Sequence, residues 1–91
     1  TFIIRVQGKS MTNVGIHDGD LLIVDKSLNP KNFSTVIANV NDELVVKTLV
    51  KSKEANYLTS GSKRTSDKLN LIDNPEIIIW GVVTYVIHKQ Q

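Results

Sequence analysis

The sequence has no cysteine among its 91 residues and only two prolines, one tryptophan, two tyrosines and two phenylalanines. Without cysteine the chain has neither a disulfide scaffold nor a thiolate-bound zinc site, and this composition fits a cytoplasmic protein. Long apolar runs are absent as well. The longest, 21–24 and 77–83, are far shorter than the about 20 residues of a membrane-spanning helix. We therefore expect no membrane partner for this segment.

Neither sign of charge predominates. The sequence has 11 Lys and Arg and 9 Asp and Glu, which gives a formal net charge of +2. The basic residues are dispersed, so the field is too weak to indicate direct nucleic-acid binding. A composition of 41% hydrophobic and 22% charged residues is typical of a soluble globular protein. The length predicts one small domain over residues 1–91. Because Thr1 almost opens a strand and no initiator methionine precedes it, we expect an upstream segment to be missing.

Strand signals run along the whole chain, and helix signals are nearly absent. Asn41-Asp42 separates two apolar segments as a two-residue hairpin turn would, and Gly81 suggests a bend or bulge between the last two strands. Any helix would be a single turn near 10–14 or 30–33. We predict an all-β fold of curled, barrel-like sheets, with strands at 2–6, 21–24, 36–40, 43–49, 56–59, 77–80 and 82–88.

Lys47 is the most informative residue of the predicted strand 43–49. Alternation places it on the same face as Val45 and Leu49, and the other face is apolar too. Burial of a lysine disfavours its ammonium form, so a lysine in such a position can be neutral and accept a proton from a serine hydroxyl. Ser10, in the turn after Gly8, is a candidate nucleophile for this chemistry. The alternative is an edge-strand lysine that protects the sheet from pairing with other chains.

Other constellations compete with this pair. Gly8-Lys9-Ser10 resembles the end of a phosphate-binding loop, but that motif needs a glycine where Ile3 stands. Trp80, Tyr85 and Tyr57 suggest either a stacking platform for a ligand or, as we favour, core and interface residues.

The run from His17 to Asp20 places an imidazole and two carboxylates within four residues. A metal site is conceivable there, but further ligands have no clear source in the sequence. We favour a turn in which the Asp side chains bond the local backbone, and we expect no metal and no cofactor. A triad of Ser10, His17 and Asp20 ranks below the lysine hypothesis, because triad members usually come from distant segments.

Three segments together resemble the self-cleaving serine peptidase domain shared by LexA-type repressors and UmuD. They are 6–11 (Val-Gln-Gly-Lys-Ser-Met), 15–25, which begins Gly-Ile-His-Asp-Gly-Asp, and 43–49 (Glu-Leu-Val-Val-Lys-Thr-Leu). The spacing of Ser10 and Lys47 agrees with the family pattern, and 80–88 resembles its last strands. The sequence departs from the family pattern at Phe33-Ser34, where many relatives have Gly-Asp, and over 51–75, which shows little of that pattern.

The resemblance implies that neutral Lys47 deprotonates Ser10 for attack on a peptide bond of its own N-terminal segment. The backbone amides of Lys9 and Ser10 would stabilise the oxyanion, and Met11 would pack the turn. In the family, cleavage belongs to the SOS response to DNA damage and is prompted by the RecA filament on single-stranded DNA. A UmuD-like protein then forms a homodimer and serves a translesion DNA polymerase subunit in SOS mutagenesis and DNA repair.

A UmuD-like protein is favoured because the chain ends directly after the last strand and no helix-turn-helix is visible. The alternative is the peptidase and dimerisation domain of a LexA-like or phage-type repressor, whose DNA-binding domain would precede Thr1. Two further hypotheses stay open. One is a dimerising, polymerase-binding module with an idle dyad, and the other is a signal peptidase, which normally needs a membrane anchor.

Overall fold

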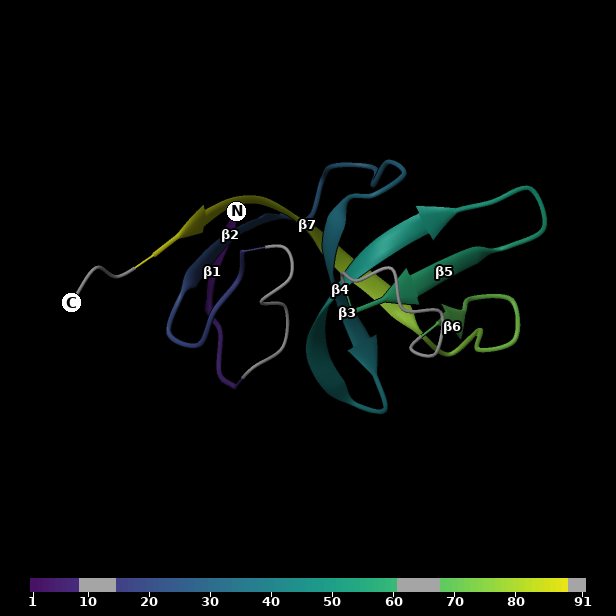
Figure 1. Ribbon diagram of the computed structural model, residues 1–91, viewed down its shortest axis with the longest axis horizontal. Coiled ribbons are helices and arrows are strands. Elements are labelled where there is room, and N and C mark those ends of the chain that lie inside the picture. Colours follow the sequence, from purple (N-terminus) through teal and green to yellow (C-terminus); the bar gives the residue numbers. More distant parts are fainter. Residues whose placement is uncertain (9–14, 61–67, 89–91) are drawn as a thin grey trace.

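The computed structural model describes residues 1–8, 15–60 and 68–88. In these residues it contains strands and turns and no helix, which confirms the all-β prediction. The strands form one antiparallel sheet of order β1-β2-β7-β3-β4-β5-β6, which stays open with β1 and β6 as its edges (Figure 1). Their bounds are β1 (Phe2–Arg5), β2 (Leu21–Asp25), β3 (Thr35–Val40), β4 (Glu43–Lys51), β5 (Asn56–Thr59), β6 (Leu69–Asn70) and β7 (Ile78–Ile87).

Most predicted strands lie within two residues of the observed ones, but the C-terminal pair is different. Residues 78–87 form one continuous strand, so the prediction of two strands separated at Gly81 is wrong. The irregularities lie beside that glycine: pairing with β3 passes over Trp80, and pairing with β2 passes over Thr84. These two bulges let one strand bend without breaking. The short strand β6 was not predicted, and 30–33 contains a turn rather than a helical turn.

Two of the turns contain non-glycine residues with a positive φ angle. Asn41 and Asp42 have φ of 52° and 64°, as a type I′ hairpin requires, which confirms the predicted two-residue connection between β3 and β4. Phe33 has φ of 68°, in the left-handed region that favours glycine. Its N–H donates to the Leu49 carbonyl oxygen (2.7 Å), so the turn is tied to β4.

The long strand β7 joins two halves of the sheet. Its C-terminal part pairs with β2, its N-terminal part pairs with β3, and Val82 alone pairs with both. The buried apolar residues form two clusters. One contains Val6, Ile16, Leu22 and Val24 together with Ile37 of β3, and the other contains Val36, Ala38, Leu49, Leu58 and Val82.

Within the described ranges, no helix is long and apolar enough to cross a membrane.

Gly81 of β7 lies close against Val24 of β2. A Cβ atom added there would lie 2.6 Å from Val24 Cγ1. We expect Gly81→Ala to lower the free energy of unfolding by about 1–3 kcal/mol, because a well-packed site must shift to accept the methyl group. Urea denaturation measures the change. In a Val24→Ala background the added cost should shrink, and an equal cost in both backgrounds would contradict the contact.

Candidate active site

The strand register fixes the face on which Lys47 lies. In β4, Lys47 is directly opposite Val36 of β3, and Val45 is opposite Ala38. Opposed residues of an antiparallel pair share a face. Lys47 therefore lies on the face of the second apolar cluster, which contains Val36, Ala38 and Leu49, as its alternation with Val45 and Leu49 predicts.

The amine of Lys47 has a specific partner. Lys47 Nζ donates to Ser60 Oγ over 3.0 Å at a partly buried position. Thr48 pairs with Thr59 at the end of β5, so a continuation of this register by one residue places Ser60 opposite Lys47. In the described part of the chain, the ion pairs are those of Asp20 with two histidines, and no carboxylate is paired with Lys47. Among the described residues, the amine thus faces a neutral hydroxyl and no counterion.

The predicted nucleophile Ser10 lies outside the described residues, as do Lys9 and Met11. The structure does describe the chain on either side of them. Gly8 has φ of 92°, and its N–H donates to Asp18 Oδ1 (2.8 Å). Val6 makes two backbone hydrogen bonds to the same turn, from its N–H to the Asp20 carbonyl and from the Gly19 N–H to its own carbonyl, each 2.8 Å long. The segment that precedes Ser10 in the sequence is therefore anchored to the turn before β2.

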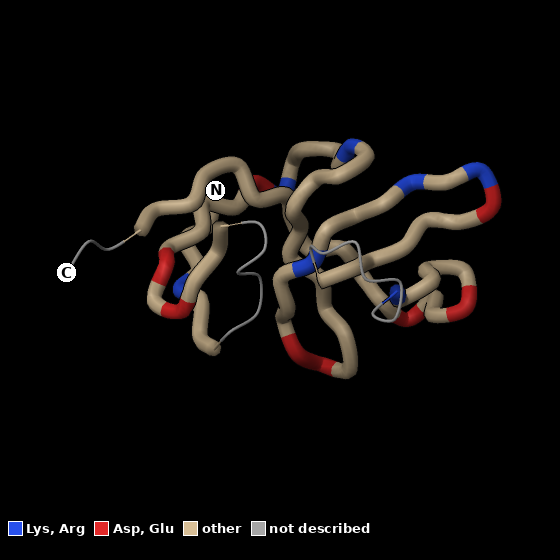
Figure 2. The backbone as a smooth tube through the Cα atoms, in the orientation of Figure 1, with Lys and Arg blue, Asp and Glu red and all other residues tan. Residues whose placement is uncertain are grey.

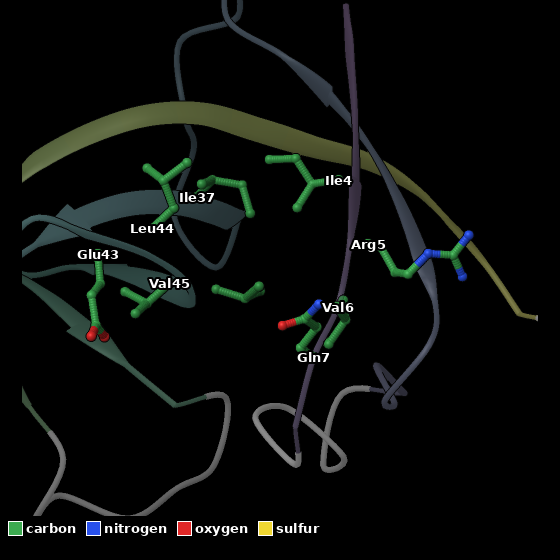
Figure 3. Close-up of a pocket in the computed structure, with 9 residues that line it drawn as sticks. Ile4, Arg5, Val6, Gln7, Ile37, Glu43, Leu44 and Val45 are labelled. Carbon is green, nitrogen blue, oxygen red and sulfur yellow. The ribbon is translucent and has the colours of Figure 1, made fainter.

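A pocket of about 250 Å³ lies between two segments that precede Ser10 and Lys47 in the sequence. Ile4, Arg5, Val6 and Gln7 line it from the β1 side, directly before Gly8. Ile37 and residues 43–46, directly before Lys47, line it from the β3–β4 side. Figure 3 shows apolar side chains facing one another across this space, with Arg5 and Glu43 on opposite sides. Its lining is mainly apolar with a few polar side chains, Arg5, Gln7 and Glu43, as is common in binding pockets.

The turn at 17–20 is held by its aspartates, as the sequence predicts. Asp20 Oδ2 accepts the His17 backbone N–H (2.8 Å), and Asp18 holds Gly8. Burial raises the pKa of the Asp20 carboxyl, but the hydrogen bond from His17 and the imidazoles of His88 and His17 outweigh it and hold that pKa below its ordinary value. The side chain of His17 is 3.9 Å from this carboxylate, too far for the hydrogen bond of a catalytic triad.

Two residues of this region were missed in the sequence. Ser60 stands one position beyond a strand, and only the register shows that it meets Lys47. His88 Nδ1 lies 2.8 Å from Asp20 Oδ2, although the two are at opposite ends of the chain. The presence of just two histidines was the one available signal.

The aromatic residues do not gather into one platform. Trp80 packs on Phe2, with ring centroids 4.9 Å apart, and Lys26 Nζ lies 4.6 Å from its ring centroid. Tyr57 is covered separately by Lys68. These contacts support the interpretation of Trp80 and Tyr57 as packing residues.

Basic and acidic residues are dispersed along the described backbone, with acidic residues at several turns (Figure 2).

Comparison with known proteins addresses the chain as a whole. The model of the Peptidase S24-like family matches residues 1–84. Protein ImpA of Escherichia coli is 37% identical over 90 residues, which cover 98% of this chain and 59% of ImpA. Protein MucA of Escherichia coli is 36% identical over 85 residues, with 93% and 58% covered. A LexA repressor of Photorhabdus laumondii is 40% identical over 76 residues, with 82% and 31% covered.

The chain thus spans less than two thirds of the length of these curated relatives. Family membership rests on agreement over nearly all of its own length, and it confirms the resemblance seen in the motifs around Ser10 and Lys47. The chain belongs to the S24 family of serine peptidases.

Proposed function

We propose that this domain is the self-cleaving peptidase of a UmuD-like SOS-response protein, with Ser10 as nucleophile and Lys47 as general base. The observation that carries the proposal is the setting of Lys47, which is partly buried on an apolar face and bonded to a hydroxyl. A lysine with a neutral partner keeps a lone pair available once it loses its proton, whereas a carboxylate partner would favour the ammonium form.

The reaction follows from these roles. Ser10 Oγ attacks the carbonyl carbon of the scissile bond while its proton passes to Lys47 Nζ, and the backbone amides of Lys9 and Ser10 receive the developing oxyanion. Lys47 then gives that proton to the leaving amine, and water hydrolyses the acyl-enzyme. We place the substrate, a segment of the chain's own N-terminal part, in the pocket beside residues 4–7 and 43–46, because that pocket borders both motifs.

The wider setting follows from the family resemblance. We propose a RecA filament on single-stranded DNA as the activator and a translesion polymerase subunit as the partner of the cleaved form. The alternative, the peptidase domain of a LexA-like repressor, is supported by the similarity to LexA repressors. Both alternatives use the same dyad, and the residues before Thr1 distinguish them: a short arm with a cleavable bond, or a DNA-binding domain.

Homodimerisation is proposed from the outer face of β1, β2 and β7. Ile3, Ile23 and Tyr85 are paired in one cross-strand row, on the face opposite the row of Ile4, Leu22 and Val86 that packs in the first apolar cluster. Ile3 is 65% exposed and Tyr85 70% exposed. An exposed apolar row of this kind marks an interface, and we propose that a second copy of the chain packs against it.

The dyad is tested in a precursor that restores the upstream residues. Ser10→Ala and Lys47→Ala should each abolish self-cleavage, and Lys47→Arg should fail too, because arginine does not become neutral at accessible pH. Gel analysis over time measures the rate, and circular dichroism checks that each variant is folded. Cleavage near the parent rate in either alanine variant would contradict the dyad. Loss of activity in His17→Ala, with a plateau already reached by neutral pH, would favour the triad.

The same assay tests the partner of Lys47. The rate should rise with pH, because only the neutral amine accepts the serine proton and a free lysine titrates near about 10.4. Ser60→Ala should lower the rate across the profile, since Ser60 holds the amine in place. Ser62→Ala, a matched change in the same region of the sequence, is the control. Identical profiles for both variants would show that Ser60 does not position the base.

The dimer is tested by light scattering at micromolar concentration. The parent chain should show twice its mass of 10.1 kDa. Ile3→Lys should give monomers, because it places a charge within the apolar row. Ile72→Lys is the matched control, since Ile72 is 66% exposed and lies outside that row. A monomeric parent, or equal dissociation by both variants, would contradict the interface.

A further inference from the structure

The two histidines of this chain converge on one carboxylate. His88 Nδ1 lies 2.8 Å from Asp20 Oδ2, and His17 Nδ1 lies 3.9 Å from the same oxygen. The two imidazole rings stand edge to face with their centroids 5.7 Å apart. One ligand atom from each of the three side chains can be chosen so that all lie within 4.8 Å of one another.

The fold explains how residues from opposite ends of the sequence meet. Leu21 of β2 is paired with Ile87 of β7, so a continuation of that register by one residue places Asp20 opposite His88. The turn then brings His17 back, because the Asp20 N–H donates to the His17 carbonyl (3.1 Å) and Asp20 Oδ2 accepts the His17 N–H (2.8 Å). The cluster is therefore built on hydrogen-bonded backbone rather than on loose side chains.

We propose that His17, Asp20 and His88 form a binding site for a divalent first-row transition ion, for which Zn²⁺ is the probe. Two imidazoles and one carboxylate are a donor set that such ions prefer to Mg²⁺ or Ca²⁺. This site is independent of the dyad, since it uses neither Ser10 nor Lys47. His88 is the further ligand that could not be located from the sequence alone.

The geometry fits an ion after small movements. Zinc binds nitrogen and oxygen at about 2.0–2.2 Å, so two ligands of one ion lie roughly 3–4 Å apart. The two distances to Asp20 Oδ2, 2.8 Å and 3.9 Å, are close to that range. The widest separation, 4.8 Å, must shorten, and the His17 and His88 side chains are 58% and 53% exposed, so their rings have room to turn. Asp20, 5% exposed, stays fixed as the anchor.

Neighbouring charges permit the site. The Arg5 guanidinium reaches the same turn, but it donates to the Gly19 carbonyl oxygen (3.3 Å). Within the described ranges, the ion-pair partners of the Asp20 carboxylate are the two histidines. An ion bound by His88 Nδ1 and Asp20 Oδ2 takes the place of the direct contact between these two atoms. It would tie the end of β7 to the turn that also holds Val6 and Gly8, which precede Ser10 in the sequence.

The test is isothermal titration of the tag-free chain with ZnCl₂. The parent should bind one Zn²⁺ per chain with a Kd in the micromolar range. His17→Ala and His88→Ala should each weaken binding at least tenfold, and both are expected to fold because the rings are largely exposed. Asp73→Asn, which removes an exposed carboxylate elsewhere, should bind as the parent does.

A second measurement keeps the site separate from weak surface binding. Since the sequence has no other histidine, both imidazole signals in the NMR spectrum belong to this cluster. One equivalent of Zn²⁺ should shift both signals together. Absence of binding, binding that survives both histidine variants, or a shift of one imidazole alone would overturn the three-ligand site and leave the His–Asp–His contacts as structural hydrogen bonds.

Discussion

The rest of this structure depends on one constraint, which is that both halves of the sheet share strand β7. β7 pairs with β2 through one part of its length and with β3 through the other, and Val82 alone belongs to both pairings. The two halves of the sheet lie on either side of this junction (Figure 1). Its bulges at Trp80 and Thr84 and the missing side chain at Gly81 allow the strand to bend there. The relative placement of the two halves is therefore set by β7.

The candidate active site is divided between those halves. The segment that leads to Ser10 is anchored to the turn before β2, in the first half, whereas Lys47 lies on β4, in the second. The pocket between residues 4–7 and 43–46 spans the two. Each half holds its own part of the site with local bonds, Gly8 to Asp18 in one and Lys47 to Ser60 in the other. How close the two parts of the site lie to each other is thus determined by the sheet as a whole.

Sequence reasoning succeeded where the determinants are local. The hairpin at Asn41-Asp42 follows from turn chemistry, and the face of Lys47 follows from simple alternation. It failed where long-range pairing decides. The continuity of β7 across Gly81 depends on neighbours far away in sequence, and β6 has only two residues. Ser60 and His88 stand just beyond strand ends, so their partners are determined by registers that no local pattern contains.

The central claim, that Lys47 acts on residue 10, is tested most directly by a thiol placed at that position. The chain has no cysteine, so Ser10→Cys creates a single thiol whose alkylation by iodoacetamide is measured against pH. A free cysteine titrates near about 8.5, and a neutral lysine amine that accepts the thiol proton leaves an ion pair that stabilises the thiolate. The account predicts half-maximal reactivity well below that pH, with a return toward it when Lys47→Gln is added. The same profile with and without Lys47 would contradict the account.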